Sequence, residues 1–280
     1  MPEQLWNSST VPELKSSEFL KIREFAHTTF GLDLRLGKER LVSARLGKHL
    51  RAGGFRSFDQ YLQHVTSDKT GAALITLIDS LTTNHTSFLR EQDHFAFLCN
   101  TVLQAYLTRR KFRVWCAASS TGEEPYSIAL SLLEKLGSAA VPEPQILATD
   151  ISTRVLEIAR RGAYSSERLA GLPRDWVRKY FLRGERSLRD TYQIRADVRA
   201  KISFSRVNLT APFPMGEPFA VVFCRNVMIY FNKETQTDVV NRLAACLEPG
   251  GYLFVGHAES LSGIDQPLKY VRPAVYQKRK

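Results

Sequence analysis

The sequence contains few of the features that mark secreted, membrane or redox proteins. Its four cysteines, Cys99, Cys116, Cys224 and Cys246, are far apart in apolar runs and lack the CxxC or CxxH spacing of a metal or redox pair. No run approaches the about 18 apolar residues of a membrane span. The first residues show no basic stretch followed by an apolar core. We therefore expect buried, reduced thiols and a cytoplasmic protein.

The size and texture of the chain predict two domains. Its 280 residues with 44% hydrophobic content exceed what one small core needs. Residues 16–80 show helical periodicity and no convincing strand, and the helix expected at 38–52 is closed by Gly53 and Gly54. The polar run LTTNHTSFLRE at 81–91 marks the junction. We place a helical domain at 1–81 and a second domain at 82–280.

Beyond residue 111, short apolar strands alternate with helices, which is typical of an α/β fold with a parallel sheet. The expected strands are 113–119, 145–150, 201–209, 220–227 and 251–257. The expected helices are 124–136, 153–161 and 233–247. Residues 162–200 interrupt the alternation with two strand-like runs, which predict a small antiparallel β-hairpin insert.

The positive charge is concentrated. Residues 154–206 hold fourteen Lys and Arg against six Asp and Glu, so +8 of the net +11 comes from this segment. Residues 1–81 contribute only +2, from eleven against nine. Such a surplus attracts nucleic acid, anionic lipid or an acidic protein, although a solvated face is the alternative for any charge run.

The loop after the first expected strand is poor in glycine. AASSTGEEPYS contains only Gly122 and therefore lacks the triple-glycine turn that a dinucleotide pyrophosphate requires. Asp150 ends the second strand, where a carboxylate can accept the ribose hydroxyls of an adenosine. A nucleoside without phosphates indicates S-adenosylmethionine. The alternatives are a helix cap for Asp150, although Ser152 or Thr153 could cap instead, and a helix-dipole role for Glu124.

Five separated blocks resemble the CheR chemotaxis methyltransferases over nearly the whole chain. They are LTTNHTSFLRE, VWCAASSTGEEPYSIA, ATDISTRVLEIARRGAY, SRVNL and FCRNVMIYFNKETQ, followed by a strand ending in GHAES. The resemblance implies a Rossmann-like methyltransferase domain after an all-α domain. It also implies that S-adenosylmethionine methylates glutamate side chains of chemoreceptors, leaving S-adenosylhomocysteine.

The resemblance further implies a set of cofactor-binding residues: Asn84, Thr86, Arg90, Glu124, Asp150, Asn208, Leu209, Arg225 and Asn226. Among these, Arg90 would bind the methionine carboxylate and Asp150 the ribose. Tyr230 matches a tyrosine close to the transferring methyl, so Arg90 and Tyr230 are the catalytic candidates. Leu89 stands where the family usually has a second phenylalanine, which bears on the packing behind Arg90.

The reaction itself requires little acid or base chemistry. A glutamate with a pKa near about 4.3 is already ionised at neutral pH, so methyl transfer to its carboxylate needs no general base. His85, His94 and His257 lie near the proposed site without helical spacing, so we expect packing or surface roles and no metal. The HAES turn at 257–260 is expected to serve loop structure.

The expected partners are acidic receptor helices. Family resemblance suggests that the helical domain faces them, and the basic side chains Arg45, Lys48 and Arg51 are the candidate substrate-binding residues. The hairpin insert can hold a receptor C-terminal tail in some family members. The +8 segment with this insert is therefore a second candidate surface.

Three other functions were weighed. A nucleic-acid methyltransferase would share fold, cofactor and charge, but the segment after the fourth strand reads RNVMIY at 225–230 and lacks the prolines of base amino-methylases. A cofactor-sensing module that binds receptors without turnover would not need Tyr230 and Arg90. A dinucleotide oxidoreductase is disfavoured by the single-glycine loop.

Overall fold

The computed structural model describes residues 12–137, 142–186, 189–213 and 216–279. The chain divides between Thr83 and Asn84 into two compact units. The expected boundary, after residue 81, lies two residues earlier.

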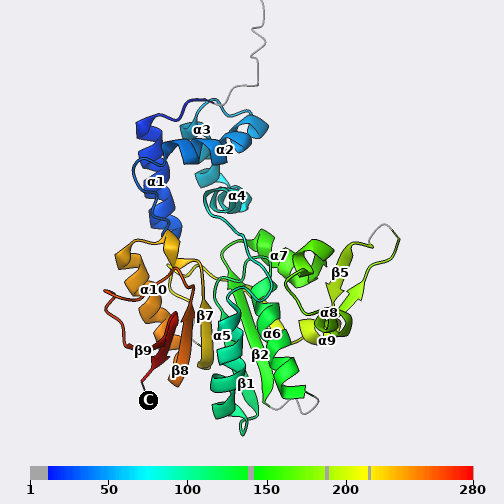
Figure 1. The fold of residues 1–280 in the computed structure, drawn as a ribbon. Helices are drawn as coiled ribbons and strands as arrows, with labels where there is room; N and C mark the ends of the chain where they lie inside the picture. Colours follow the sequence, from blue (N-terminus) through cyan, green and yellow to red (C-terminus); the bar gives the residue numbers. More distant parts are fainter. Residues whose placement is uncertain (1–11, 138–141, 187–188, 214–215, 280) are drawn as a thin grey trace, which may run out of the picture. The chain divides into compact units, whose positions relative to one another are not determined.

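From residue 12 onward, the first unit is built from four helices (Figure 1): α1 Ser16–Phe30, α2 Glu39–Gly53, α3 Phe58–Ser67 and α4 Ala72–Leu81. On α2, Val42, Leu46 and Leu50 recur every four residues and are all fully buried, as their periodicity predicts. The helix ends at Gly53, and the cap residue Gly54 has a left-handed φ of 67°, which glycine adopts without strain. The apolar stripe of α2 therefore packs in the core of this unit, while Lys48 and Arg51 on the same helix are exposed.

The second unit contains a seven-stranded sheet in the order β6-β2-β1-β7-β8-β10-β9. Its strands are β1 Lys111–Cys116, β2 Glu143–Asp150, β6 Ile202–Arg206, β7 Phe219–Cys224, β8 Leu247–Val255, β9 Leu268–Arg272 and β10 Val275–Lys278. The strands from β6 to β8 pair in parallel, and β10 pairs antiparallel with both β8 and β9. The chain runs outward from β1 in both directions, so the carboxyl ends of β1 and β7 flank the switch point.

Helices cover both faces of this sheet (Figure 1). They are α5 Gln92–Phe97, α6 Glu123–Leu136, α7 Thr153–Arg161 and α10 Lys233–Cys246, with a π turn Leu98–Val102 and a 3-10 turn Leu103–Tyr106 after α5. Along β7, Val221 and Phe223 pack in the core that contains α5 and α6. The side chains of Val222 and Cys224 point to the opposite face of the sheet and pack in the core that contains α10. The strand is buried at every residue because both faces are covered.

The expected insert is a second, three-stranded antiparallel sheet in the order β3-β5-β4. Its elements are β3 Ala163–Ser165, the 3-10 turn Ser166–Leu169, α8 Arg174–Tyr180, β4 Phe181–Arg183, β5 Thr191–Ile194 and α9 Ala196–Arg199. The hairpin of β4 and β5 confirms the prediction, and β3 adds a strand that the sequence did not indicate. Residues 187–188 of its connection lie outside the described residues.

The α/β class and the five parallel strands are as predicted, while α5 and the pair β9 and β10 were not foreseen. All four cysteines are free and buried, as expected. Among the described residues, no helix combines the length and apolar character needed to cross a bilayer.

Candidate functional site

The loop between β1 and α6 is held against the elements that follow β2. The Ser119 N–H donates to the Thr149 carbonyl at 2.8 Å, and the Tyr164 hydroxyl donates to the Thr121 carbonyl at 2.8 Å. Gly122 precedes α6 with a φ of 99°, and a Cβ there would lie 2.8 Å from both the Ala159 Cβ and the Tyr164 hydroxyl. The single glycine of this loop thus serves a tight turn and close packing rather than a phosphate cradle.

Asp150 lies at the carboxyl end of β2 and faces this loop. Its Oδ2 accepts from the Ser120 N–H at 2.9 Å, and its Oδ1 accepts from the Ser152 N–H at 3.0 Å. The cap of α7 is Ser152, whose hydroxyl accepts from the Val155 N–H at 3.4 Å. The helix-cap alternative for Asp150 is therefore excluded. Its half-buried carboxylate is held by two backbone amides at the edge of the sheet where the parallel strands have their carboxyl ends.

The guanidinium of Arg225, just after β7, is the centre of a buried charge cluster. Its side chain is 1% exposed, Nη2 lies 3.1 Å from Glu91 Oε2, and Nη1 lies 3.1 Å from Glu124 Oε2. Nη2 also donates to the Arg90 carbonyl at 2.5 Å. Burial raises the pKa of the Glu124 carboxyl, and Arg225 opposes that rise. The cation therefore joins the segment before α5 to the start of α6, and removing it would leave two largely buried carboxylates, 12% and 13% exposed, without their cation.

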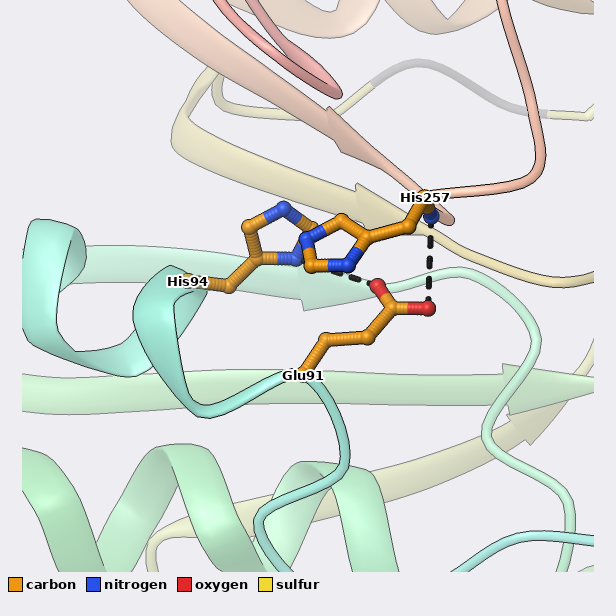
Figure 2. Close-up of side chains that lie close together, drawn as sticks. All are labelled: Glu91, His94 and His257. Atoms are coloured by element: carbon orange, nitrogen blue, oxygen red, sulfur yellow. Dashed lines mark hydrogen bonds and ion pairs between the residues drawn. The ribbon is translucent and has the colours of Figure 1, made fainter.

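Glu91 belongs to a second cluster that sequence analysis missed, with His94 and His257 (Figure 2). Figure 2 shows its carboxylate between the His94 ring and the His257 backbone. Its Oε2 lies 3.5 Å from His94 Nδ1, and its Oε1 accepts from the His257 N–H at 3.2 Å. The His94 and His257 rings meet edge to face with centroids 4.8 Å apart. His94 is fully buried, which favours packing over the surface role that the sequence also allowed.

These three residues are also a geometric candidate for a metal site. Their ligand atoms lie within 4.8 Å of one another. However, Arg225 Nη2 lies 3.1 Å from the same Glu91 oxygen, and a fixed positive charge at that distance opposes a bound cation. We therefore assign the cluster to packing and loop positioning.

Glu123, the first residue of α6, is a fully buried carboxylate that the sequence analysis did not single out. Its side chain is 1% exposed, and its Oε1 lies 2.7 Å from Arg168 Nη1. Its Oε2 accepts from the Thr121 hydroxyl at 2.7 Å. The ion pair joins α6 to the turn that follows β3. The charge of Arg168, one cation of the +8 segment, is therefore balanced by a carboxylate of the same protein.

The junction run at 84–91 passes beside the β1 loop. The Asn84 carbonyl accepts from the Ser120 hydroxyl at 3.0 Å, and Arg90 Nη1 donates to the His85 carbonyl at 3.1 Å. Leu89 has a left-handed φ of 53°, and its N–H donates to the Ser127 hydroxyl at 2.9 Å. Leu89 also packs against the core on the α5 side. Leucine at this position therefore contributes to the core packing next to Arg90 in the chain. Thr86 is half-buried in the same run.

Two further segments bring predicted residues to the same sheet edge. After β6, the Asn208 Oδ1 accepts from the Thr210 N–H at 3.1 Å and from its hydroxyl at 2.8 Å, while Leu209 is buried. After β7, Asn226 has a left-handed φ of 59°, and Tyr230 ends the 3-10 turn Met228–Tyr230. The predicted cofactor residues thus all lie in the second unit: after strand ends, in the junction run or, for Glu124, in the first turn of α6.

Comparison with known proteins identifies the family. Residues 84–276 match the family model "CheR methyltransferase, SAM binding domain", and residues 17–82 match "CheR methyltransferase, all-alpha domain". The chemotaxis protein methyltransferase 2 of Pseudomonas aeruginosa is 38% identical over 260 residues, covering 92% of this chain and 92% of that protein. The chemotaxis protein methyltransferase of Escherichia coli is 37% identical over 264 residues, covering 94% and 91%. This chain belongs to the CheR methyltransferase family.

The CheR assignment makes the protein an S-adenosylmethionine-dependent methyltransferase with its cofactor domain in the second unit. The sheet edge suits that cofactor. Asp150 offers a fixed carboxylate for hydroxyl groups, and the loop between β1 and α6 is not built as a pyrophosphate cradle. The side chains of Arg225 and Glu124 form an ion pair, which joins the segment after β7 to the start of α6 in this CheR fold.

Proposed function

We propose that this CheR protein transfers the methyl group of S-adenosylmethionine to glutamate side chains of chemoreceptors. The supporting observation is the match of both units to chemotaxis protein methyltransferases over at least nine-tenths of each chain. The sulfur–methyl bond breaks as a methyl–oxygen bond to the carboxylate forms, which yields a glutamate methyl ester and S-adenosylhomocysteine. Chemoreceptor helices that carry such glutamates are cytoplasmic, and we propose that the enzyme acts there.

The proposed reaction depends on orientation. A glutamate carboxylate with a pKa near about 4.3 is ionised at neutral pH, so no proton must be removed before it attacks the methyl group. Holding nucleophile and methyl donor in line can contribute about 7 to 11 kcal/mol to the barrier reduction. We propose that Tyr230 orients the reacting groups and that Arg90 binds the methionine carboxylate of the cofactor.

The remaining cofactor contacts are proposed from the same edge of the sheet. Asp150 is assigned to the ribose because its carboxylate is fixed there and does not cap α7. Backbone and side-chain groups along the junction and after β6 and β7 would complete the site: Asn84, Thr86, Asn208, Leu209 and Asn226. Arg225 and Glu124 are proposed to act by holding the Arg90 carbonyl and the start of α6.

We propose that the exposed face of α2 meets the receptor. Lys48 and Arg51 are exposed, whereas Arg45 donates to the Leu81 carbonyl at 2.5 Å and to the Thr83 hydroxyl at 3.1 Å. The guanidinium of Arg45 therefore secures the end of α4, and its neighbours on α2 are the cations available to an acidic helix. Charge complementarity of this kind sets encounter rate and register.

A charge reversal tests this surface. Lys48→Glu with Arg51→Glu should slow methylation of receptor membranes and flatten its salt dependence, while S-adenosylmethionine affinity stays unchanged. Arg35→Glu with Lys69→Glu is the matched control, because it makes the same charge change at exposed positions outside α2. Equal rates for both double variants at low salt would show that α2 is only a solvated face.

We propose that the insert is a second, optional contact for a receptor tail. Part of the +8 surplus is already balanced, since three of its cations pair with carboxylates outside the segment: Arg168 with Glu123, Lys179 with Glu134, and Lys201 with Glu143. Arg186 and Arg189 at the hairpin are exposed. Reversing both to Glu should slow methylation only of receptors that carry their native C-terminal tail, and equal loss with tailless receptors would refute a tether.

The central experiment uses the full chain, S-adenosylmethionine labelled in its methyl group, and chemoreceptor membranes. Base-labile label released as methanol is the expected result, because glutamate methyl esters hydrolyse in base. Stable label in added DNA or RNA would identify a nucleic-acid methyltransferase. Cofactor binding without incorporation into receptor would identify a sensing module.

A further inference from the structure

Glu259, in the turn after β8, gathers the loops that follow two neighbouring strands. Its side chain is buried at 8% exposure, and its carboxylate accepts from four backbone amides. Oε2 accepts from Asn226 N–H at 2.8 Å and from Gly256 N–H at 2.6 Å. Oε1 accepts from Met228 N–H at 2.8 Å and from Ile229 N–H at 3.3 Å. One side chain thus holds most of the backbone between Arg225 and Tyr230.

This loop has a conformation that needs such an anchor. Asn226 has a left-handed φ of 59°, and Met228 and Ile229 begin a 3-10 turn whose first amides have no partner within the turn. The approach is so close that a Cβ on Gly256 would lie 2.5 Å from Asn226 Nδ2 and 2.9 Å from Glu259 Oε2. The amides converge on one point, and the carboxylate there is the acceptor that satisfies them.

The same geometry excludes a proton-transfer role for Glu259. A carboxylate offers about four acceptor positions, and four backbone amides occupy them here. Burial raises the pKa of the Glu259 carboxyl, while the four N–H donors act in the opposite direction. Its oxygens point into the loop, so any influence on the reaction passes through loop geometry.

We propose that Glu259 is a positioning residue for methyl transfer, which fixes the loop at 225–230 and thereby places Tyr230. This inference rests on the proposed role of Tyr230 at the reacting centre. Displacement of a reacting group by about 1 Å can cost about 100-fold in rate, so a side chain that sets the loop backbone controls kcat without touching substrate.

The test is Glu259→Gln, measured as kcat, KM and amide hydrogen exchange. The glutamine amide group would face two N–H donors, so it can satisfy only one of the two amide pairs. We expect kcat to fall about 100-fold, with a smaller change in the dissociation constant of S-adenosylmethionine. Exchange of the Met228 and Ile229 amides should accelerate. Glu248→Gln is the control, since Glu248 pairs with Arg109 at the opposite end of β8 and its loss should leave kcat within about twofold.

A double-variant cycle with Tyr230→Phe identifies the route of the effect. If Glu259 acts through Tyr230, Glu259→Gln should cost much less in the Tyr230→Phe background than in the wild type. Equal losses in both backgrounds, or a Glu259→Gln kcat close to wild type, would overturn the inference. If Glu259→Gln does not fold, Glu259→Asp keeps the charge but cannot reach both amide pairs, and it should show the same kcat-selective loss.

The cycle also separates this inference from the proposed function. An unchanged kcat for Tyr230→Phe alone would refute the role of Tyr230, whatever Glu259 does. Absence of receptor methylation by the wild type would refute the proposed substrate. In that case the amide exchange of Met228 and Ile229 still reports whether Glu259 holds the loop, and unchanged exchange would overturn the inference.

Discussion

Replacing His94 with glutamine should make the second unit less sensitive to acid. The His94 ring is fully buried, and it meets the Phe254 ring edge to face with centroids 5.4 Å apart. Burial, and then the Arg225 guanidinium, lower the pKa of His94 from 6.5 to about 4. The acids Asp93 and Glu91 oppose this shift, and His257 adds to it. The fold thus requires the neutral imidazole.

The sign of the effect follows from proton binding in the two states. Between pH 6.5 and about 4, the unfolded chain binds a proton at His94 that the folded chain does not. The free energy of unfolding therefore falls as the pH falls through this window. With about 1.4 kcal/mol for each unit of pKa shift, the loss between pH 7 and pH 5 is about 2 kcal/mol.

Buried carboxyls in the same unit respond in the opposite direction. Burial raises the pKa values of Glu123 and Glu124, so acidification favours the folded state at these groups. Urea unfolding of the wild type and of His94→Gln at several pH values isolates the contribution of His94, because the carboxyls contribute equally to the free energy of unfolding of both proteins. The gap in stability between the two proteins should shift in favour of the variant by about 2 kcal/mol from pH 7 to pH 5. Parallel curves would refute the argument.

Three further predictions concern the cofactor edge. Asp150→Ala should weaken S-adenosylmethionine binding by about 1 to 3 kcal/mol in calorimetry, since ribose hydroxyls would lose a charged acceptor; an unchanged dissociation constant would remove Asp150 from the site. Tyr230→Phe should lower kcat and largely spare cofactor affinity, whereas Arg90→Ala should weaken binding as well. Equal binding losses would contradict these roles. Gly122→Ala should cost about 2 kcal/mol or more in urea unfolding, because φ is 99° and Tyr164 is too close. Wild-type stability would contradict that reading.

Sequence patterns predicted the parallel strands because each is a short apolar run. The run at 220–227 corresponds to β7, whose six residues are all buried. The antiparallel strands β9 and β10 were missed because they are short and the edge strand β9 is largely exposed, so the run LKYVR carries no strong alternation. The fold class could be predicted from the hydrophobic periodicity and the lengths of the apolar runs. The antiparallel strands β9 and β10 could not, because they depend on pairing with other strands of the sheet.

The hydrophobic periodicity of the sequence could place residues on one face of a helix, but it could not identify the residues that they contact in the fold. On α2, Lys48 and Arg51 are exposed as expected, but Arg45 reaches the carbonyl at the end of α4. The Arg225 cluster shows the same limit. Glu91 and Arg225 are 134 positions apart and meet only because β7 ends beside the segment that leads into α5. The family resemblance named Arg225 and Glu124 but gave no sign that they bind each other.

Four buried or largely buried carboxylates near the carboxyl ends of the strands have structural partners. Glu91 and Glu124 contact Arg225, Glu123 contacts Arg168, and Glu259 accepts from backbone amides. A general base needs an acceptor position directed at the substrate, whereas these oxygens are directed at neighbouring loops. Methyl transfer to an ionised carboxylate removes no proton before attack, so the reaction can proceed while every one of these groups is committed to holding the loops. The contacts of these four carboxylates thus serve geometry, which is the contribution that an in-line displacement most requires.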